Sequence, residues 1–529
     1  MSPTSPWSPL QHKVFRALWI AGLVSYIGVW MQNVGAAWLM TSLTTSPLMV
    51  ALIQTATTLP AFLLSLPGGM LADLMDRRRL LLFTSGWMVL SVAAIAAMTL
   101  SGDIGPWSLL ALTFALGAAS ALQMPAWQST TSDTLPRTLV PTGIALAGIS
   151  YNVARAVGPA LAGVIIASFG SGVVFAVTAL CYMAMFSVLL RWQSPPQRTS
   201  DLPPESMLGG IQSGLRYVRH SPPVLGQILR TIITMTCASA LWALLPVAAR
   251  AQLGLDAGGY GLLLTCLGGG AVLGAMNLAR LRERFGTDRT VNVATLLFAL
   301  SMLCLAFVKI HGIVYVALVG GGFFWLCMTA VSAAVVQTSV PTWVRARVVS
   351  IFFLSFQASM AIGAVLWGSI ASHLDVSFSL AIAAGLLVVT LPYARRYRLK
   401  MGSEAEVTPS MHWTQIAVDA EPDPEDGPVA VQISYRINPA YRREFADAAY
   451  AIRRIRQRDG ATSWRLYKDL SDPSCYIERF VVDSWAEYLR QQARATLADK
   501  LAQERVFAFH VDIGPPQMRH FIMEPPPRA

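Results

Sequence analysis

Twelve long apolar stretches fill most of the first four hundred residues, and they restrict the fold more than any other feature of the sequence. A helix needs roughly 20 apolar residues to cross about 30 Å of hydrocarbon. Lipid offers backbone groups no hydrogen bonds, so such stretches are expected to cross it as helices. The sequence therefore predicts an all-α membrane protein with twelve transmembrane helices. The expected spans are approximately 15–40, 47–73, 79–100, 107–128, 142–168, 171–190, 226–248, 259–280, 290–308, 312–336, 346–372 and 377–394.

The composition agrees with a membrane protein and excludes several other classes. Only 13% of the 529 residues are charged, whereas a soluble domain carries about 25%. The net charge of +11 is spread over short clusters between apolar spans, so no nucleic-acid partner is expected. The six cysteines form no CxxC pair, and no phosphate-binding GxxxxGK[ST] loop is present. No disulfide framework, metal site, cofactor or ATPase is implied, and no removable signal peptide is evident.

The basic residues indicate how the spans are oriented. Lys and Arg gather in alternate segments between the spans, and the opposite segments are nearly bare. Cytoplasmic loops carry this excess of positive charge. With an even number of spans, both termini are expected in the cytoplasm and the protein in the bacterial inner (plasma) membrane. The basic segments contain Lys13, Arg16, Arg77 to Arg79, Arg137, Arg191, Arg198, Arg216, Arg219, Arg280 to Arg289, Arg345, Arg347 and Arg395 to Lys400.

The spans divide into two related halves. A polar, proline-punctuated linker at 191–225 follows the sixth span and contains a short basic amphipathic run. A shift of 205 positions superposes Gly69 on Gly274 and Gly158 on Gly363, in two separate helices. We therefore expect a cytoplasmic tail at 1–14 and two six-helix bundles, at 15–190 and 226–400.

The composition changes sharply after Lys400. Residues 401–428 are acidic and rich in proline, as in a solvated linker. From Val429 the pattern alternates between strand and helix in the order βαββαβ, with one helix expected from Ser484 to about Phe507. Residues 429–529 are therefore predicted to form a cytoplasmic α+β domain of the ferredoxin-like type.

One motif places the membrane part in a family. Gly69-Met70-Leu71-Ala72-Asp73 followed by Arg77-Arg78, after the second of twelve helices, resembles the cytoplasmic signature of the major facilitator superfamily. The resemblance implies that Asp73 contacts the start of helix 11, near Arg345 to Val348. It also implies that the loop arginines join a charge network that steadies the outward-open state. The alternative is that these charges only fix topology and stabilise the fold.

Two departures from the family pattern narrow the resemblance. Leu74 stands where the family usually has Arg, and Asp76 where it has Gly. The second departure resembles the siderophore-exporter branch, of the transmembrane secretion effector type. In helix 5, the run from Ala154 to Gly163 resembles the antiporter signature of proton-driven exporters, with Gly158, Pro159 and Gly163 as the packing positions. Alternatively, these small residues merely permit close helix packing.

Arg155 is the sharpest single candidate in the membrane part. Thirteen residues of the span 142–168 lie on either side of it, so the guanidinium starts about 20 Å from each end of the helix. A charge at this depth normally faces a cavity or a partner. Tyr151 and Asn152 share its face at three- and four-residue spacing. We expect these three residues to attract an anionic or catechol-like cargo. The alternative is an arginine bonded to backbone carbonyls for stability.

Further cavity candidates are Trp30, Gln32, Asn33 and Gln357, which could stack on and hydrogen-bond a bulky amphipathic solute. For any one of them, a helix-helix hydrogen bond is the alternative. No span carries an Asp or Glu near its middle. Coupling to protons is therefore implied by the family resemblance alone, and its residue is not located.

The C-terminal domain resembles the antibiotic-biosynthesis-monooxygenase type of dimeric α+β barrel. The residues that carry the resemblance are Gly460 to Trp464 and Tyr476 to Phe480. The resemblance implies a homodimer as one option, and oxygenase chemistry as another. Trp464 and Tyr476 are nevertheless typical of sheet packing, so a dimerising or regulatory module is preferred to an enzyme.

The sequence as a whole predicts a secondary active transporter. We expect it to export a siderophore or a similar amphipathic small molecule by alternating access, with the proton gradient as the driving force. A broad multidrug efflux pump is the second transport hypothesis, and a membrane-tethered, cofactor-free oxygenase is the alternative from another class. The expected partners are the small-molecule cargo, the lipid bilayer and, as one option, a second copy of the chain.

Overall fold

The computed structural model describes residues 7–193, 207–396, 402–410 and 422–524. Within these ranges the side chains of 66, 70, 72–74, 207–211 and 393–396 are not described. Most of the first four hundred residues form helices, and the remainder forms a small domain built on one sheet.

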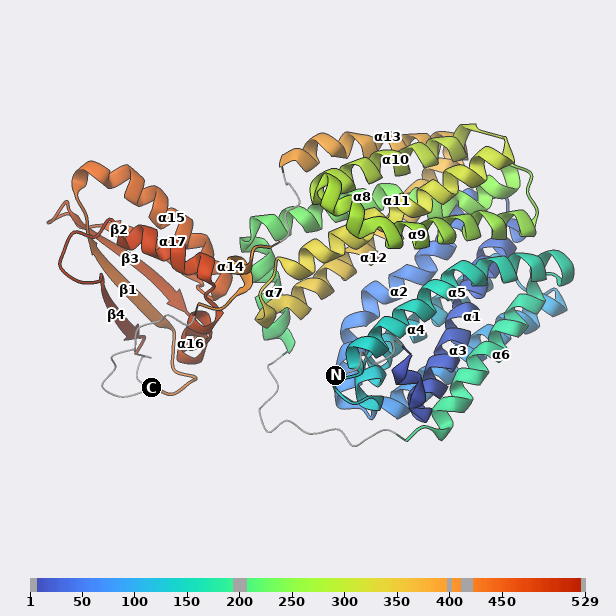
Figure 1. Ribbon diagram of the computed structural model, residues 1–529, viewed down its shortest axis with the longest axis horizontal. Helices are drawn as coiled ribbons and strands as arrows, with labels where there is room; N and C mark the ends of the chain where they lie inside the picture. Colours follow the sequence, from blue (N-terminus) through green and yellow to red (C-terminus); the bar gives the residue numbers. More distant parts are fainter. Residues whose placement is uncertain (1–6, 194–206, 397–401, 411–421, 525–529) are drawn as a thin grey trace, which may run out of the picture. The chain divides into compact units, whose positions relative to one another are not determined.

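The first six long helices pack against one another. Contacts are extensive between α1 and α6, α1 and α5, α2 and α4, and α3 and α6 (Figure 1). Proline starts α2 and α4 and occupies the second position of α5, where the missing N–H is not needed. The bounds are α1 Lys13–Leu43, α2 Pro47–Leu74, α3 Arg77–Ser101, α4 Pro106–Thr134, α5 Val140–Phe169 and α6 Ser171–Arg191.

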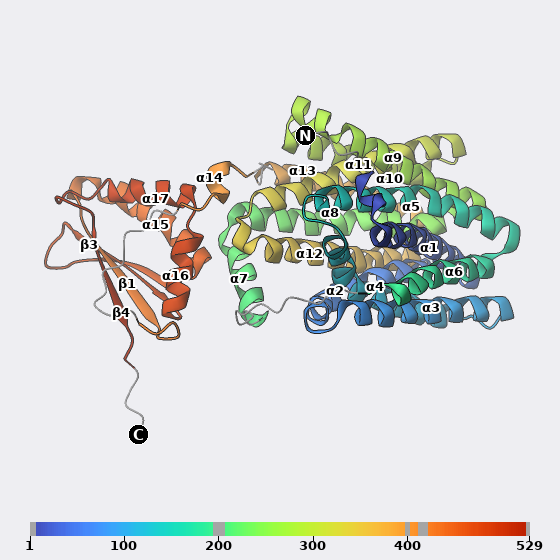
Figure 2. The same cartoon turned by 60° about the horizontal axis from the view of Figure 1, so that its bottom comes forward.

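Six more long helices follow the linker (Figure 2). Within the described residues, eleven helices of the chain are long and apolar enough to cross a membrane, and the apolar part of α13, Val376–Pro392, is shorter. Together they match the twelve stretches expected from the sequence. The bounds are α8 Pro222–Val247, α9 Ala257–Phe285, α10 Thr287–Phe307, α11 His311–Thr338, α12 Thr342–His373 and α13 Val376–Arg396.

The chain separates into two compact units. The first contains residues 1–201, 230–331 and 353–398, and so includes most of both helical bundles. The second contains 202–229, 332–352 and 399–529. It therefore joins the C-terminal domain with the linker helix α7 (Met207–His220) and the adjoining ends of α8, α11 and α12.

The second unit has an apolar cluster where α7 meets the ends of the long helices. Tyr217 and Val218 of α7 are buried against Val340, Val344 and Val348. The amphipathic run expected in the linker is thus a helix whose apolar side is covered by protein. Because α7 packs on the start of α12, the linker is attached to the second bundle's end.

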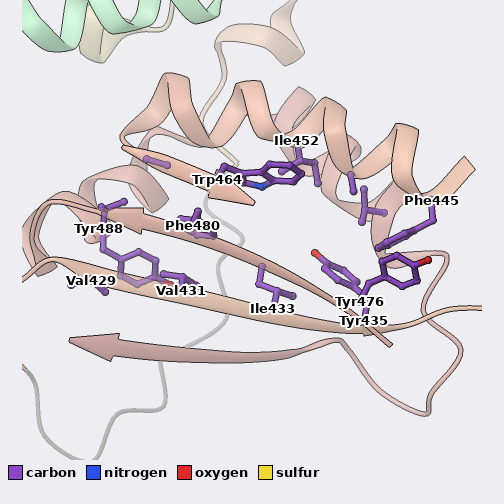
Figure 3. Packing of buried hydrophobic residues seen from close by; sticks show 14 of the residues in the cluster. Val429, Val431, Ile433, Tyr435, Phe445, Ile452, Trp464, Tyr476, Phe480 and Tyr488 are labelled. Atoms are coloured by element: carbon purple, nitrogen blue, oxygen red, sulfur yellow. The ribbon is translucent and has the colours of Figure 1, made fainter. Parts of the chain in front are cut away.

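The C-terminal domain is a four-stranded antiparallel sheet with strand order β2-β3-β1-β4. Helices α15, α16 and α17 contribute to a single core cluster on one face of the sheet (Figure 3). This is the ferredoxin-like arrangement expected from the sequence. The bounds are α14 Glu404–Val407, β1 Val429–Arg436, α15 Arg442–Asp459, β2 Ser463–Lys468, β3 Cys475–Val482, α16 Trp485–Arg494, α17 Leu497–Phe507 and β4 Gln517–Ile522.

One expected element is divided in two. The helix predicted from Ser484 to about Phe507 is wrong as a single element, because it breaks at Ala495, whose backbone is extended. Thr496 then caps a new helix by accepting from the N–H of Asp499, while the Asp499 carboxylate accepts from the N–H of Thr496. This capping box is a local start signal that competes with continuation of the helix.

Candidate functional site

The two bundles meet at the end opposite the arginine-rich loops. Thr55 of α2 donates to the carbonyl of Ala361 in α12, at 3.0 Å. The ring of Trp38 in α1 stacks on Tyr260 in α9, with centroids 5.6 Å apart. Arg250, in the π-helical turn after α8, lies 5.6 Å from the Trp38 ring. All of these contacts lie between the middle of the bundles and the sparsely charged end, which is therefore closed.

Glycines bring α5 and α9 into backbone contact at this end. A Cβ built on Gly163 would lie 3.0 Å from the Cα of Gly261, and one on Gly261 would lie 2.8 Å from the carbonyl oxygen of Pro159. Gly158 allows the same approach to α1, since a Cβ there would lie 2.6 Å from the Cβ of Trp30. The three small residues singled out in helix 5 thus lie where helices of both bundles converge.

Arg155 lies between two indole rings that come from different bundles. Its guanidinium carbon is 5.8 Å from the ring centre of Trp30 in α1 and 5.9 Å from that of Trp242 in α8. Both distances are within the range of a cation–π attraction. Arg155 is the sixteenth residue of the thirty in α5, so it is close to the midpoint of the helix. The charge therefore lies at the seam between the bundles and near mid-depth.

More aromatic rings extend this arrangement on both sides. Tyr151 lies 6.3 Å from Trp30 and 5.5 Å from Tyr26, which was not among the candidates from the sequence. On the other bundle, Trp242 is in edge contact with Trp325, at 5.5 Å between centroids. A positive charge framed by aromatic rings favours a flat, electron-rich or anionic solute.

Two hydrogen-bond donors at this site have no partner. The indole Nε1 atoms of Trp30 and Trp242 are buried and form no hydrogen bond with the described residues. Buried donors of this kind usually find a partner. Since both belong to rings that face Arg155, the site can offer a cation and two N–H donors to one bound molecule.

The remaining cavity candidates do not all gather here. Gln32 is buried, but it lies four residues from Gly28 and three from Gly35, both of which pack on α6. It therefore belongs to the α1–α6 side of the first bundle rather than to the Arg155 site. Asn152 donates to the carbonyl of Gly148 in its own helix, at 2.9 Å. Asn33 and Gln357 are half-buried on α1 and α12, respectively.

The signature after α2 is only partly described. The side chain of Asp73 lies outside the described residues, so its expected contact near Arg345 to Val348 stays a prediction. Gly69 has no atom within 4 Å of a Cβ built on it. Arg77 donates two hydrogen bonds to the carboxylate of Asp133 at the end of α4, at 2.9 and 2.7 Å. This pair joins the loop to the first bundle.

Arg78 caps another helix of the first bundle. Its guanidinium donates to the carbonyls of Leu189 and Leu190, at 3.3 and 2.6 Å, at the end of α6. A cation is favourable at a helix C-terminus because unpaired carbonyls point toward it. Both arginines therefore hold together the arginine-rich end of the first bundle in this state.

A partly buried ion pair in the second bundle was missed from the sequence. Arg230 of α8 donates to Asp288, at 3.2 Å, and to Asn292, at 2.6 Å, both at the start of α10. The available signal was an arginine, Arg230, inside the expected span 226–248. Among the described residues, no cluster of three or more His, Cys, Asp or Glu side chains could hold a metal ion.

The C-terminal domain uses its candidate residues in its own core. The buried carboxylate of Glu478 accepts from the indole of Trp464 at 3.0 Å, from Tyr435 at 2.8 Å and from Arg456 at 3.2 Å. Tyr476 packs in edge contact with Phe445. Trp464 and Tyr476 are thus placed as packing residues, in line with the structural alternative.

Within the second unit, a charged cluster joins this domain to α7 and to the start of α12. The Oε1 atom of Glu487 accepts from Arg494 at 2.6 Å and from Arg216 of α7 at 2.8 Å. The Arg494 guanidinium also lies 4.4 Å from the ring centre of Trp343. Burial alone would raise the pKa of Glu487, but the two arginines outweigh it and hold the pKa below its usual value.

The comparison with solved structures concerns the fold. The fold resembles a bacterial homologue of the human lysosomal transporter Spinster in an inward-facing, occupied conformation, with a TM-score of 0.61 and 14% identity over 75% of this chain and 99% of that one. It also resembles the nucleoside transporter NupG, with a TM-score of 0.62 and 10% identity over 73% and 99%. Two six-helix bundles around a mid-depth site are the fold of the major facilitator transporters.

The chain belongs to the transmembrane secretion effector family, whose model matches residues 4–527. Among curated relatives, the multidrug efflux pump Tap of Mycobacterium bovis is 27% identical over 73% of this chain and 95% of that protein. The enterobactin exporter EntS of Salmonella typhimurium is 25% identical over 73% and 94%. The staphyloferrin A transporter of Staphylococcus aureus is 21% identical over 72% and 95%. The chain is a multi-pass membrane protein.

Proposed function

We propose that this protein exports a siderophore or a similar anionic, amphipathic small molecule. The observation that carries the proposal is the placement of Arg155 between Trp30 and Trp242. Relatives named for enterobactin and staphyloferrin support a siderophore as the cargo class. A catecholate or carboxylate can pair with the guanidinium while its flat or apolar parts contact the rings.

The transport cycle is alternating access. The arginine-rich loops are assigned to the cytoplasm by the positive-inside rule, which puts both termini there and the bundles in the bacterial inner membrane. The closed end then faces outward and the cargo enters from the cytoplasm. Rocking of the bundles about the Arg155 site would open the contacts between Gly163 and Gly261 and release the cargo outside. The proton gradient is the proposed driving force.

Substitution of Arg155 tests the cargo site directly. In a strain that lacks its own exporter, we expect Arg155→Ala to lower efflux of enterobactin at least tenfold with unchanged membrane abundance, since each 1.4 kcal/mol of lost binding is about tenfold. Arg289→Ala, which removes an exposed arginine at the start of α10, is the matched control. An equal loss of protein in the membrane would show instead that Arg155 is structural.

Broad multidrug efflux is the second transport function, favoured by the efflux-pump relative and by the aromatic lining of the site. The siderophore exporter and the multidrug pump differ in the charge of the cargo and in whether transport requires Arg155. A multidrug pump would move neutral and cationic drugs whether or not Arg155 is present. Loss of enterobactin efflux in Arg155→Ala, with efflux of a cationic dye retained, would assign the arginine to anionic cargo.

The C-terminal domain is proposed as a regulatory module rather than an enzyme. Its contacts through Glu487 with Arg216 attach it to the linker helix between the bundles. A second copy, bound through the same domain, is an alternative arrangement. An oxygenase would need the domain for its chemistry. Deletion of 410–529 should therefore alter the rate or control of efflux, and cargo that leaves the cell unmodified from both forms would exclude the oxygenase.

A further inference from the structure

One face of the C-terminal sheet has a row of arginines. The three helices of the domain pack with Trp464, Phe480 and Val431 in one core cluster. Since side chains alternate along a strand, the residues between these point to the opposite face. That face is called here the open face, and its strand positions include Arg465, Arg479, Gln432 and Arg519.

These four residues stand side by side across the sheet. Arg465 of β2 pairs with Arg479 of β3, Arg479 with Gln432 of β1, and Gln432 with Arg519 of β4. Adjacent strands are about 4.8 Å apart, so the row spans about 15 Å. The three arginines are exposed, and none forms an ion pair with the described residues.

Repulsion between these arginines destabilises the C-terminal domain when no ligand is bound. Like charges directly opposite each other in an antiparallel pair are destabilising, and Arg465 directly opposes Arg479. The buried arginines of the same domain are paired, as Arg456 is with Glu478 and Arg458 with Asp459 and Asp499. A row of like charges that crosses the sheet with no carboxylate paired to it breaks a rule of sheet stability, and such departures are typical of binding sites.

The positive charge is confined to the single row. The neighbouring rows of the open face are uncharged. One contains Ser463, Val481, Ala430 and Phe521, and the other contains Tyr467, Ile477, Ser434 and Gln517. An extended polyanion or a lipid surface is usually met by a broad basic patch. A short cationic row between uncharged side chains instead fits a small molecule with several carboxylates.

We propose that the open face is a binding site for a small, multiply charged anion of the polycarboxylate class. Arg465 and Arg479 hold adjacent carboxylates by charge-assisted hydrogen bonds, and the amide of Gln432 and the guanidinium of Arg519 extend the contact. A second copy of the chain does not fit this face as well. Two such sheets placed face to face would bury arginine rows against each other with no counter-charge. The proposal is independent of the nature of the exported cargo.

The test measures citrate binding to the full chain in neutral lipid nanodiscs by isothermal titration calorimetry. The sheet variant carries Arg465→Gln, Arg479→Gln and Arg519→Gln. The matched control carries Arg442→Gln, Arg443→Gln and Arg453→Gln, which removes the same charge from exposed positions of α15. Acetate serves as the singly charged ligand. Retention of the chain's oligomeric state and thermal unfolding profile shows that each variant is folded.

We expect citrate to bind far more tightly than acetate, and the sheet variant to lose at least thirtyfold in affinity while the control stays within about threefold. Equal losses in both variants would mean non-specific attraction and would overturn the proposal. Undetectable citrate binding would also overturn it. If the unmodified chain then dimerises, or binds vesicles of anionic lipid through the same three arginines, the open face serves that partner instead.

Discussion

Arg155 and Trp242 lie 5.9 Å apart, although they belong to opposite halves of the chain. The contact places a charge of the first bundle against an aromatic ring of the second. A site that includes both must change when the bundles move relative to each other. This is the property that alternating access requires of a central binding site.

Trp242 is predicted to contribute to cargo binding together with Arg155. Trp242→Phe removes the unpaired indole N–H and weakens the cation–π attraction, which is worth about 1–2 kcal/mol when desolvated. We expect about a tenfold loss in affinity for enterobactin. Binding of radiolabelled enterobactin measures this, because the readout does not depend on tryptophan fluorescence. In an Arg155→Ala background the same change should cost little. Additive losses in the double variant would contradict a shared site, and Trp87→Phe in α3 is the control.

Gly261 is predicted to control closure at the sparsely charged end. Gly261→Ala places a Cβ 2.8 Å from both the Cα of Gly163 and the carbonyl of Pro159. Overpacking of this kind costs about 1–3 kcal/mol, so the population should shift toward the state open at this end. Gly269→Ala in the same helix meets no atom within 4 Å and is the control.

Thiol labelling measures this shift. In a background without the six native cysteines, Thr55→Cys reports access from outside, because Thr55 contacts Ala361 in the closed state. A membrane-impermeant maleimide should label it several times faster in Gly261→Ala than in Gly269→Ala. Equal rates in the two variants would show that the glycine contact does not decide closure.

Glu487 is predicted to hold α7 to the C-terminal domain. Glu487→Gln leaves Arg216 and Arg494 without their carboxylate. We expect a loss of about 2–3 kcal/mol, somewhat below the usual 3–5 kcal/mol for a buried pair because Arg216 is partly exposed. Amide hydrogen exchange in α7 should then accelerate at least thirtyfold. Glu504→Gln, which breaks the exposed pair with Lys500, should change little, and unchanged exchange in both variants would refute the contact.

His520 is predicted to make the C-terminal domain less stable in acid. Burial lowers the pKa of His520 below its usual 6.5, and the hydroxyl of Tyr488 lies 2.6 Å from its Nε2 atom, with which the neutral ring can hydrogen-bond. The unfolded chain therefore takes up the proton more readily. The contribution of His520 is complete above pH 6.5 and is lost as the pH falls from there toward the lowered pKa.

Hydrogen exchange of β4 in the full chain, compared at pH 7.5 and 5.5 after correction for the intrinsic rate, measures this effect. We expect faster opening at pH 5.5 in the natural sequence and a smaller difference in His520→Gln. A pH difference that survives the substitution unchanged would assign the effect to another group.

The local patterns of the sequence predicted most of the fold. The lengths of the apolar stretches predicted the helices, and the alternation of apolar and polar residues predicted β1 and β3. The constant offset between Gly69 and Gly274 predicted two halves. The prediction of one helix from 484 to 507 was wrong, because helical periodicity continues on both sides of Thr496 while the capping box at Thr496 starts a new helix. A short-range signal of this kind decides between two conformations that differ by about 1 kcal/mol.

The candidate site was predicted only in part. The depth of Arg155 follows from counting residues along one helix, and this needs no tertiary information. Its second ring, Trp242, lies 87 positions away in the chain, and no local pattern pairs the two. Gln32 was predicted to line the same cavity, but it does not lie beside Arg155. Its position two residues from Trp30 turns it toward α6, and that assignment depends on which helix lies there.

The sequence by itself determined the membrane class, the number of helices, the repeat and the charge at mid-depth, because these depend on the length and periodicity of local segments. Only the tertiary structure decided which residues share a site. It brought Arg155 between two indole rings, joined Arg216 to Glu487, and aligned three arginines of separate strands in one row. Such contacts depend on how elements pack, and packing is set by shape complementarity between segments that are far apart in the chain.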